Sequence, residues 1–164
     1  MNFLVIALAS LIPTVVGFVW YNPKVFGTAW IKTTGLTDEQ LRGVNMPLVV
    51  GLSLLFSFML GIVLNGIVIH QAALLSIVFG EPDLQDPNSA LSLMLKDFMA
   101  KYGNNFRTFK HGALHGTIAG IFFVLPIIGV NAIFERKSVV YIAIHVGYWS
   151  VCLALMGGII CAFA

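Results

Sequence analysis

The sequence predicts an all-α membrane protein, a bundle of four transmembrane helices with interfacial amphipathic helices in the first and second connectors. Hydrophobic residues make up 59% of the 164 residues, and charged residues only 10%. A soluble domain is about one quarter charged and just under half apolar, so these charges cannot cover the surface of a water-soluble fold. The chain also contains four apolar runs, each close to the ~20 residues that cross a bilayer as a helix.

The composition excludes several other classes of protein. The net charge of +2 from nine basic residues gives no stripe that could follow nucleic-acid phosphates, so no nucleic-acid partner is expected. Cys152 and Cys161 lie in one apolar run on roughly opposite faces of a helix, too far apart to form a disulfide. The apolar surface of the protein is therefore expected to contact the lipid bilayer, which is its first expected partner.

The expected spans lie in one membrane domain, residues 1–164, at about 3–20, 47–70, 111–134 and 139–163. The first run has no basic residue before it and ends in Trp-Tyr-Asn-Pro, which argues against a cleaved signal peptide. The second run resumes after His70-Gln71, so we expect its helix to overshoot the bilayer by about two turns. The third and fourth spans are antiparallel neighbours because their connection is short.

Four crossings place both termini on the same side of the membrane. The two connectors on the opposite side hold five of the nine Lys and Arg residues, and the long connector on the side of the termini holds four. The positive-inside rule gives more weight to short loops, and the five basic residues lie in the shorter loops. We therefore expect both termini to lie outside the cytoplasm.

Two amphipathic segments are expected in the connectors, at about residues 23–34 and 89–102. In the first, Asn22-Pro23 has the form of an N-cap followed by the proline favoured at the first helical position, and Gly35 can end the helix. In the second, apolar residues recur at helical spacing. The first segment is expected in the headgroup plane, and the second either on the bilayer or against the overshooting end of the second span.

Small residues recur at every fourth position on two spans. The rows are Gly112, Gly116 and Gly120 on the third span and Ser53, Ser57 and Gly61 on the second. Such rows let helix backbones approach closely, which is how helices associate in lipid. Packing inside the four-helix bundle is the simpler use of these rows, and a seam between two copies of the chain is the alternative.

Three of the four histidines are expected at one end of the bundle. His111 and His115 lie one helical turn apart at the start of the third span, and His70 lies at the end of the second span on the same side. Three imidazoles beside an acidic loop have the composition of a site for Zn²⁺, another transition metal or haem. The alternative is that each histidine lies at the headgroup boundary or bonds a neighbouring group. The acidic residues of that region are Glu81, Asp83, Asp86 and Asp97.

A second polar group is expected deeper in the bundle, formed by Thr14, Asn131, His145 and Tyr148. A buried hydrogen-bonded layer is the simpler interpretation, and the wall of a cavity for a small solute or an ion is the alternative. No Asp, Glu, Lys or Arg falls inside the spans, which argues against a coupled transporter. The remaining aromatic group is expected to anchor one membrane interface. Its members are Trp20, Tyr21, Trp30 and Tyr141.

The sequence carries no catalytic signature. No nucleophile occurs with a matching base and acid, no glycine-rich phosphate loop follows a strand, and the His-x-x-x-His pair lacks the glutamate of a zinc protease motif. We therefore expect a protein that is not an enzyme and has no cofactor apart from the metal ion considered above.

Several motifs carry a family resemblance. They are Gly17-x-x-Trp20-Tyr21-Asn22-Pro23-x-x-Phe26-Gly27-x-x-Trp30, Phe109-Lys110-His111-Gly112-Ala113-Leu114-His115-Gly116, Leu125-Pro126, Phe134-Glu135-Arg136-Lys137-Ser138, Gly147-Tyr148-Trp149 and Met156-Gly157. Together they resemble the signature of a bacterial membrane family catalogued as a domain of unknown function, over most of the chain outside residues 72 to 106. The resemblance implies a small multi-pass protein of the bacterial inner membrane and supplies no activity, substrate or catalytic residue.

The sequence thus favours a non-enzymatic packing or accessory membrane protein that associates with itself or with another membrane protein. A pathway for a small solute or an ion through the polar cavity is the alternative function. Binding of a metal or haem is the third.

Overall fold

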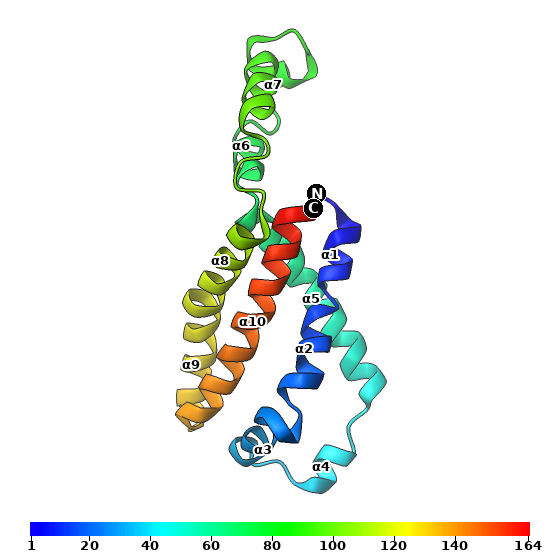
Figure 1. Cartoon of the computed structure of the whole chain (residues 1–164), viewed down its shortest axis with the longest axis vertical. Coiled ribbons are helices and arrows are strands. Elements are labelled where there is room, and N and C mark those ends of the chain that lie inside the picture. The colour runs from blue at the N-terminus through cyan, green and yellow to red at the C-terminus, as the bar shows by residue number, and fades with distance from the viewer.

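The computed structural model describes residues 1–37 and 39–164 in full, and Asp38 only as part of its helix. The regular structure of the described residues is helical, as the sequence predicts. Four long helical segments form a bundle from which a helical hairpin projects at one end (Figure 1). Each of the four is long and apolar enough to cross a membrane, and their bounds almost coincide with the expected spans. These segments are Phe3–Trp20, Met46–Val68, Phe109–Phe134 and Val139–Phe163.

The first span consists of two helices, α1 (Phe3–Ala9) and α2 (Ile12–Trp20). Pro13 lies in the first turn of α2, where its missing N–H costs no helical hydrogen bond. The hydroxyl of Ser10 donates to the carbonyl of Ile6 at 2.7 Å, so the polar group at the break is satisfied inside the bundle.

The first connector forms short helices at the end of the bundle opposite the hairpin (Figure 1). The side chain of Asn22 caps a π-helical turn, Pro23–Gly27, which leads into α3 (Thr28–Thr34). Gly35 ends α3 in the left-handed region with φ 75°, which glycine adopts without steric cost. A further short helix, α4 (Asp38–Arg42), precedes the second span. The expected segment at 23–34 thus comprises the π-helical turn and α3.

The second span, α5 (Met46–Val68), ends earlier than the sequence suggests. A continuous overshoot is expected, but Ile69 is extended with φ −109° and ψ 93°, and a separate helix α6 (Gln71–Ile77) follows. The break turns the amide of Gln71 toward the backbone carbonyls of Tyr102 and Asn105, which it bonds at 3.1 and 2.9 Å.

The projecting hairpin consists of α6, a 3₁₀ turn at Pro82–Gln85 and α7 (Ala90–Tyr102). Its helices extend beyond the bundle along the long axis of the molecule (Figure 1). Gln71 and Leu74 of α6 line a cavity together with Phe98 and Tyr102 of α7, so the two helices face each other. The helix expected at 89–102 thus lies across this cavity from α6, and its position relative to the bilayer stays a prediction.

The third span is made of α8 (Phe109–Ala119), a π-helical turn at Gly120–Val124, and α9 (Leu125–Phe134). A four-residue connection leads to α10 (Val139–Phe163), which runs back along it. A Cβ atom at Gly112 or Gly116 would clash with the α10 backbone at Gly157 or Leu153, so these two helices touch through their backbones.

The other small-residue positions also face neighbours within the chain. A Cβ on Gly120 would lie 2.5 Å from the hydroxyl of Ser150, and one on Gly61 would lie 2.8 Å from a methyl group of Ile6. Ser57 is buried, and Ser53 lines a cavity beside it. The third-span row therefore packs against α10, and Gly61 packs against α1.

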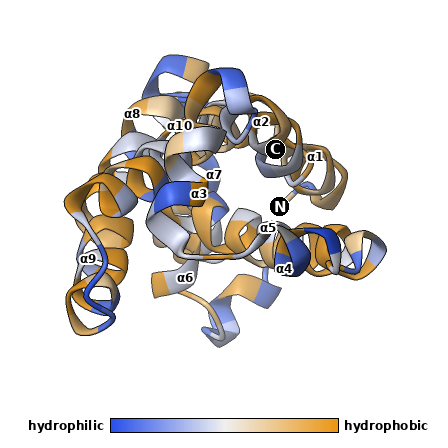
Figure 2. Ribbon diagram, turned by 90° about the horizontal axis from the view of Figure 1, so that it is seen from below, coloured by the Kyte–Doolittle hydropathy of each residue, from blue (hydrophilic) through white to orange (hydrophobic). Residues whose placement is uncertain are grey.

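A narrow core lies where α1, α5, α8 and α10 meet, and much of the remaining apolar surface is exposed. Viewed along the long axis, the spanning helices are coloured mostly hydrophobic (Figure 2). This pattern suits a bundle whose outer surface contacts lipid chains. The buried core residues are Ile6, Ala9, Leu64, Val68, Ile69, Ala119, Leu153, Met156, Ile160 and Cys161.

Candidate metal centre

His70, His111 and His115 converge at the neck between the bundle and the hairpin. His70 stands at the break before α6, and the other two project from the first turns of α8. The Nε2 atoms of His70 and His111 are 2.8 Å apart, and one ligand nitrogen from each of the three rings lies within 4.8 Å of the others. The ring centroids are 4.5 to 5.0 Å apart.

This spacing fits a transition-metal ion. In a tetrahedral zinc site the Zn–N distance is about 2.0–2.1 Å, which places ligand nitrogens about 3.3 Å from one another. The separation between His70 and His111 is about 0.5 Å shorter than that value, and all three nitrogens lie within 4.8 Å of one another, so small ring rotations would bring them to one ion. Three protein ligands would leave a fourth position for water or another small ligand.

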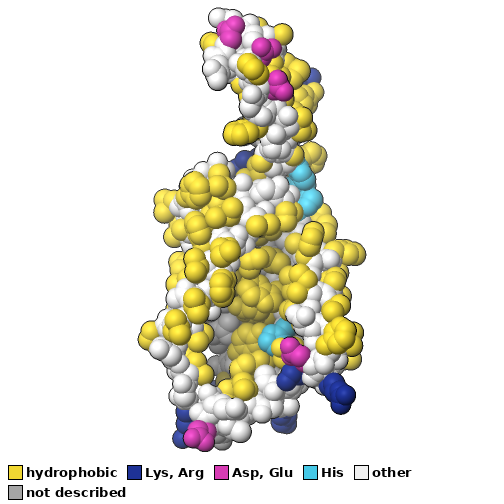
Figure 3. Space-filling model, turned by 180° about the vertical axis from the view of Figure 1, so that it is seen from behind, with side chains coloured by type: hydrophobic (Ala, Val, Ile, Leu, Met, Phe, Trp, Pro, Cys, Tyr) yellow, Lys and Arg dark blue, Asp and Glu magenta, His cyan; other side chains and the backbone are white. Residues whose placement is uncertain are grey.

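The cluster of three histidines contains no carboxylate. The sequence places it beside an acidic loop, but among the residues that the structure describes the group of potential ligands at the neck consists of the three imidazoles. Acidic side chains instead lie toward the far end of the hairpin, well away from the histidine side chains at its base (Figure 3). The reason is the break after α5, which directs the hairpin away from the bundle. A neutral set of nitrogen ligands favours ions that imidazole binds well, such as Zn²⁺, Cu²⁺ and Ni²⁺, over Ca²⁺ and Mg²⁺.

Phe106 is a neighbour of the cluster that sequence reasoning missed. It lies in the loop before α8 with φ 63°, a left-handed conformation that is uncommon for a bulky residue. This conformation carries its ring to 5.1 Å from that of His111 and 6.5 Å from that of His70. Because backbone conformation in a loop depends on tertiary contacts, no signal in the sequence marks this position.

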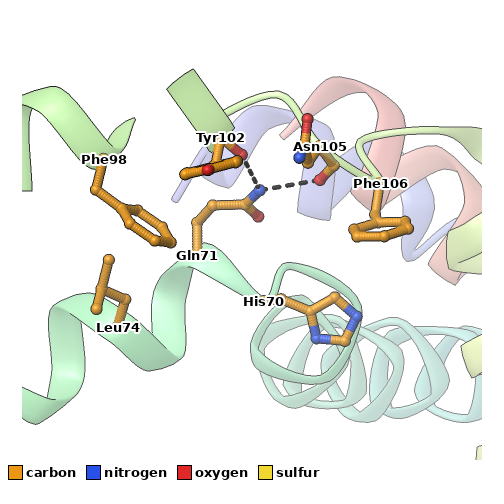
Figure 4. A pocket seen from close by; sticks show the side chains of 7 residues that line it. All are labelled: His70, Gln71, Leu74, Phe98, Tyr102, Asn105 and Phe106. Carbon is orange, nitrogen blue, oxygen red and sulfur yellow. Dashed lines mark hydrogen bonds between the residues drawn. The ribbon is translucent and has the colours of Figure 1, made fainter. Parts of the chain in front are cut away.

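A cavity of about 320 Å³ adjoins the cluster at the base of the hairpin, between α6 and α7. His70 is part of its wall. Figure 4 shows Gln71 at the start of α6, with its amide nitrogen bonded to the carbonyls of Tyr102 and Asn105. The other walls are apolar or aromatic, including Leu74 and Phe98. The neck is thus held by side-chain bonds to the backbone as well as by packing.

The deeper polar residues are only partly brought together. Thr14, His145 and Tyr148 line a second cavity of about 590 Å³ toward the opposite end of the bundle. The hydroxyl of Tyr148 donates to the carbonyl of Pro13 at 2.7 Å. Asn131 lies exposed on α9 and is not part of the lining.

The four aromatic residues expected at the interface gather around His145. The Tyr21 hydroxyl lies 3.2 Å from Nδ1 of His145, and the rings of Tyr141 and His145 have centroids 4.3 Å apart. Trp20 donates its indole N–H to the carbonyl of Ile144, and Trp30 packs edge-on against Tyr21. All four are half-buried, and their role as membrane anchors stays a prediction.

Comparison with known proteins places the chain in a family. No curated protein and no solved structure matches it. Residues 4–161 match the family described as "Protein of unknown function (DUF1761)". The match spans the four apolar helices, the neck with its three histidines and the hairpin. Because it covers nearly the whole chain, the protein belongs to the DUF1761 family.

Proposed function

We propose that this protein is a non-enzymatic membrane protein that binds one transition-metal ion at His70, His111 and His115. The observation that supports the proposal is the convergence of three imidazoles from two separate segments of the chain. Neutral imidazole is the commonest protein ligand for zinc and related ions. The proposed setting is the bacterial inner membrane, with the hairpin and the ion outside the cytoplasm.

A hydrogen bond between two rings explains part of this geometry. Neutral His70 and His111 can share one proton at the observed 2.8 Å. That bond does not require a third ring, yet His115 brings its own nitrogen within 4.8 Å of the same two. An ion accounts for all three rings, because it replaces repulsion between lone pairs with three coordinate bonds.

The proposed role is an accessory one. In the part of the chain that the structure describes, the cluster includes no carboxylate that could act as a general base next to a metal-bound water. It lies at the neck, where His70 precedes α6 and the other two ligands begin α8, so a bound ion would join the hairpin to the bundle. Self-association, or association with another membrane protein, belongs to the same proposal.

The experiment measures metal content in the full chain, purified in detergent without a polyhistidine tag. The protein is stripped with a chelator, equilibrated with Zn²⁺, and its bound ion is counted by elemental mass spectrometry. Replacement by Co²⁺ then tests for the absorption bands of a tetrahedral site. We expect about one ion per chain.

The matched variants are His111→Ala and His145→Ala, which remove one imidazole each from the two ends of the bundle. Loss of a partner outside the ligand shell already lowers metal affinity by about 10- to 100-fold, so loss of His111 is expected to cost at least as much. The His145 variant is expected to keep the ion. Equal binding by both variants, or a haem absorption band in place of a bound ion, would refute the proposal.

A further inference from the structure

The second cavity runs from the end of the bundle near α3 into its interior. At the outer end it is lined by Tyr21 and Trp30, and at the inner end by Pro13 and Ser57. Pro13 and Tyr21 are eight residue steps apart, a rise of about 12 Å along a helix, so the cavity is elongated along the bundle. Its volume of about 590 Å³ falls within the range of small-molecule sites, roughly 300–1,000 Å³.

The wall of this cavity is apolar and aromatic, with a few polar groups. Its lining includes Val49, Val50 and Phe56 from α5, and the ring of Trp149 from α10. Among the residues that the structure describes in full, no Asp, Glu, Lys or Arg belongs to the lining. A charged group placed there would lose its hydration without gaining a partner, which is strongly unfavourable. The chemistry of the wall therefore selects an uncharged molecule.

Two buried polar atoms in this wall lack a partner. The hydroxyl of Thr14 and Nε2 of His145 make no hydrogen bond to the residues that the structure describes. Buried polar groups without a partner are uncommon in native proteins, because each loses its hydration without compensation. Thr14 and His145 both line the cavity, so a molecule bound there can supply the missing partners.

The state of Tyr21 indicates which kind of partner these groups need. Burial raises the pKa of the Tyr21 phenol above its ordinary value, so the phenol keeps its proton. It can donate that proton to Nδ1 of His145, 3.2 Å away, and Nε2 then carries the ring hydrogen. In this tautomer Nε2 of His145 is a donor, and the hydroxyl of Thr14 can donate as well as accept, so a ligand that carries acceptors complements both groups.

We propose that this cavity binds an uncharged, lipid-soluble molecule with carbonyl oxygen acceptors on a planar ring, of the quinone class. Its ring lies among the aromatic side chains of the cavity, and its carbonyl oxygens accept hydrogen bonds from Thr14 and His145. Its apolar tail lies along the α5 wall. This site lies far along the bundle from the histidine cluster and does not depend on a metal.

The test uses fluorescence of the full chain in detergent, titrated with decylubiquinone as the probe. Two of the three tryptophans, Trp30 and Trp149, line the cavity, and a bound quinone quenches nearby indole rings. We expect saturable quenching at about one probe per chain. Linear quenching without saturation would mean partition into the micelle only, and would overturn the proposal.

Matched threonine variants test the hydrogen bonds. Thr14→Val removes the unpartnered hydroxyl, whereas Thr117→Val removes one that is already bonded to the carbonyl of Ala113. One hydrogen bond corresponds to roughly a tenfold change in affinity. The first variant is expected to weaken probe binding by about that factor, and the second to leave it unchanged. Equal affinity of the two variants would contradict the assigned contact.

A cavity-filling variant gives an independent check. Ser53→Phe occupies the space from α5 without altering Thr14 or His145, and it is expected to abolish saturable quenching while its helical circular dichroism is preserved. Displacement of the probe by an equal concentration of oleate would indicate an unspecific apolar slot and would refute the proposal. The variant His111→Ala is expected to bind the probe normally, so the outcome for this site is separate from the outcome for the metal site.

Discussion

Single side chains fix helix positions inside the bundle by bonding backbone carbonyls of other helices. Tyr148 on α10 reaches Pro13 on α2, and Trp20 reaches Ile144. In lipid no water competes for these donors, so each bond specifies a rotation and a depth. The sequence identifies such residues as needing partners, but not which carbonyl each one meets.

Tyr148→Phe is expected to lower the free energy of unfolding by about 1 kcal/mol, because it deletes the hydroxyl and preserves the ring. Denaturant titration of the protein in detergent micelles measures the change. An unchanged midpoint of the denaturant titration would show that the hydrogen bond from Tyr148 to Pro13 does not contribute to stability. The same variant is expected to keep its metal ion, since Tyr148 lies outside the histidine cluster.

Glycines at the contact between α8 and α10 have a different role, because they permit contact between backbones. Gly116→Ala places a methyl group against the backbone at Leu153 and is expected to destabilise the protein by about 1–3 kcal/mol. Gly66→Ala is the control, since a Cβ there meets nothing within 4 Å, and it is expected to stabilise α5 by up to about 1 kcal/mol. Thermal unfolding followed by circular dichroism compares them, and equal shifts would contradict the assigned contact.

At the scale of elements, the neck is the place where the bundle and the hairpin join. Helix α5 ends at Val68, the chain turns through Ile69, and α6 begins in a new direction. The side chain of Gln71 donates hydrogen bonds to two backbone carbonyls, one at the end of α7 and one in the loop that leads back to the bundle. The base of the hairpin is therefore joined by hydrogen bonds, and its helices extend away from the bundle.

Gln71→Glu is expected to loosen the hairpin without unfolding the bundle, because the carboxylate keeps the shape but loses both N–H donors. Hydrogen exchange of the backbone amides in residues 71–106 is expected to become about tenfold faster for each 1.4 kcal/mol by which the free energy of opening the hairpin falls. Gln85→Glu is the control, since Gln85 is exposed in the turn of the same hairpin. Faster exchange throughout the spanning helices, or none in the hairpin, would contradict this account of the neck.

At the scale of the whole molecule, both termini lie at the hairpin end of the bundle (Figure 1). The basic residues predict an orientation in which the hairpin and the histidine cluster lie outside the cytoplasm. In intact cells a membrane-impermeant thiol reagent is expected to label Asn104→Cys and not Lys24→Cys. Background is low because Cys152 and Cys161 are buried. Labelling of Lys24→Cys alone would show that the orientation is opposite to the predicted one. Labelling of both variants would refute the placement of the two connectors on opposite sides of the membrane.

Self-association is also a prediction for the whole molecule. The glycine row on α8 is already covered by α10, so a second copy has to dock elsewhere. We expect native mass spectrometry to show more than one copy per particle, and Gly116→Ala to change thermal stability without changing that number. A monomer under mild detergent conditions would contradict the expectation.

The sequence predicts what depends on local patterns. The length of each apolar run defines a span, and capping residues such as Asn22 and Gly35 define the ends of the helical segment in the first connector. Counting residues along helices brings His70, His111 and His115 to one level, where the structure also places them. Depth along a helix follows from its rise per residue, and this is why these expectations agree with the structure.

Rotation about a helix axis is not encoded in the same way. In lipid, apolar residues can face outward as well as inward, so the pattern does not show which face is buried. Asn131 lies at a suitable position along its span but turns outward, and it misses the cavity. The break at Ile69 and the left-handed Phe106 also depend on tertiary contacts that no local pattern records.

The neck has a consequence for how the molecule can vary. The chain leaves the bundle at His70 and re-enters it at His111, where the two rings touch. Because the hairpin begins and ends at adjacent points of the bundle, it can be shortened, lengthened or replaced by a foreign domain without changing the direction of the spanning helices. The hairpin is therefore a modular appendage, and an inserted reporter there would be displayed on one membrane face while the bundle keeps its arrangement.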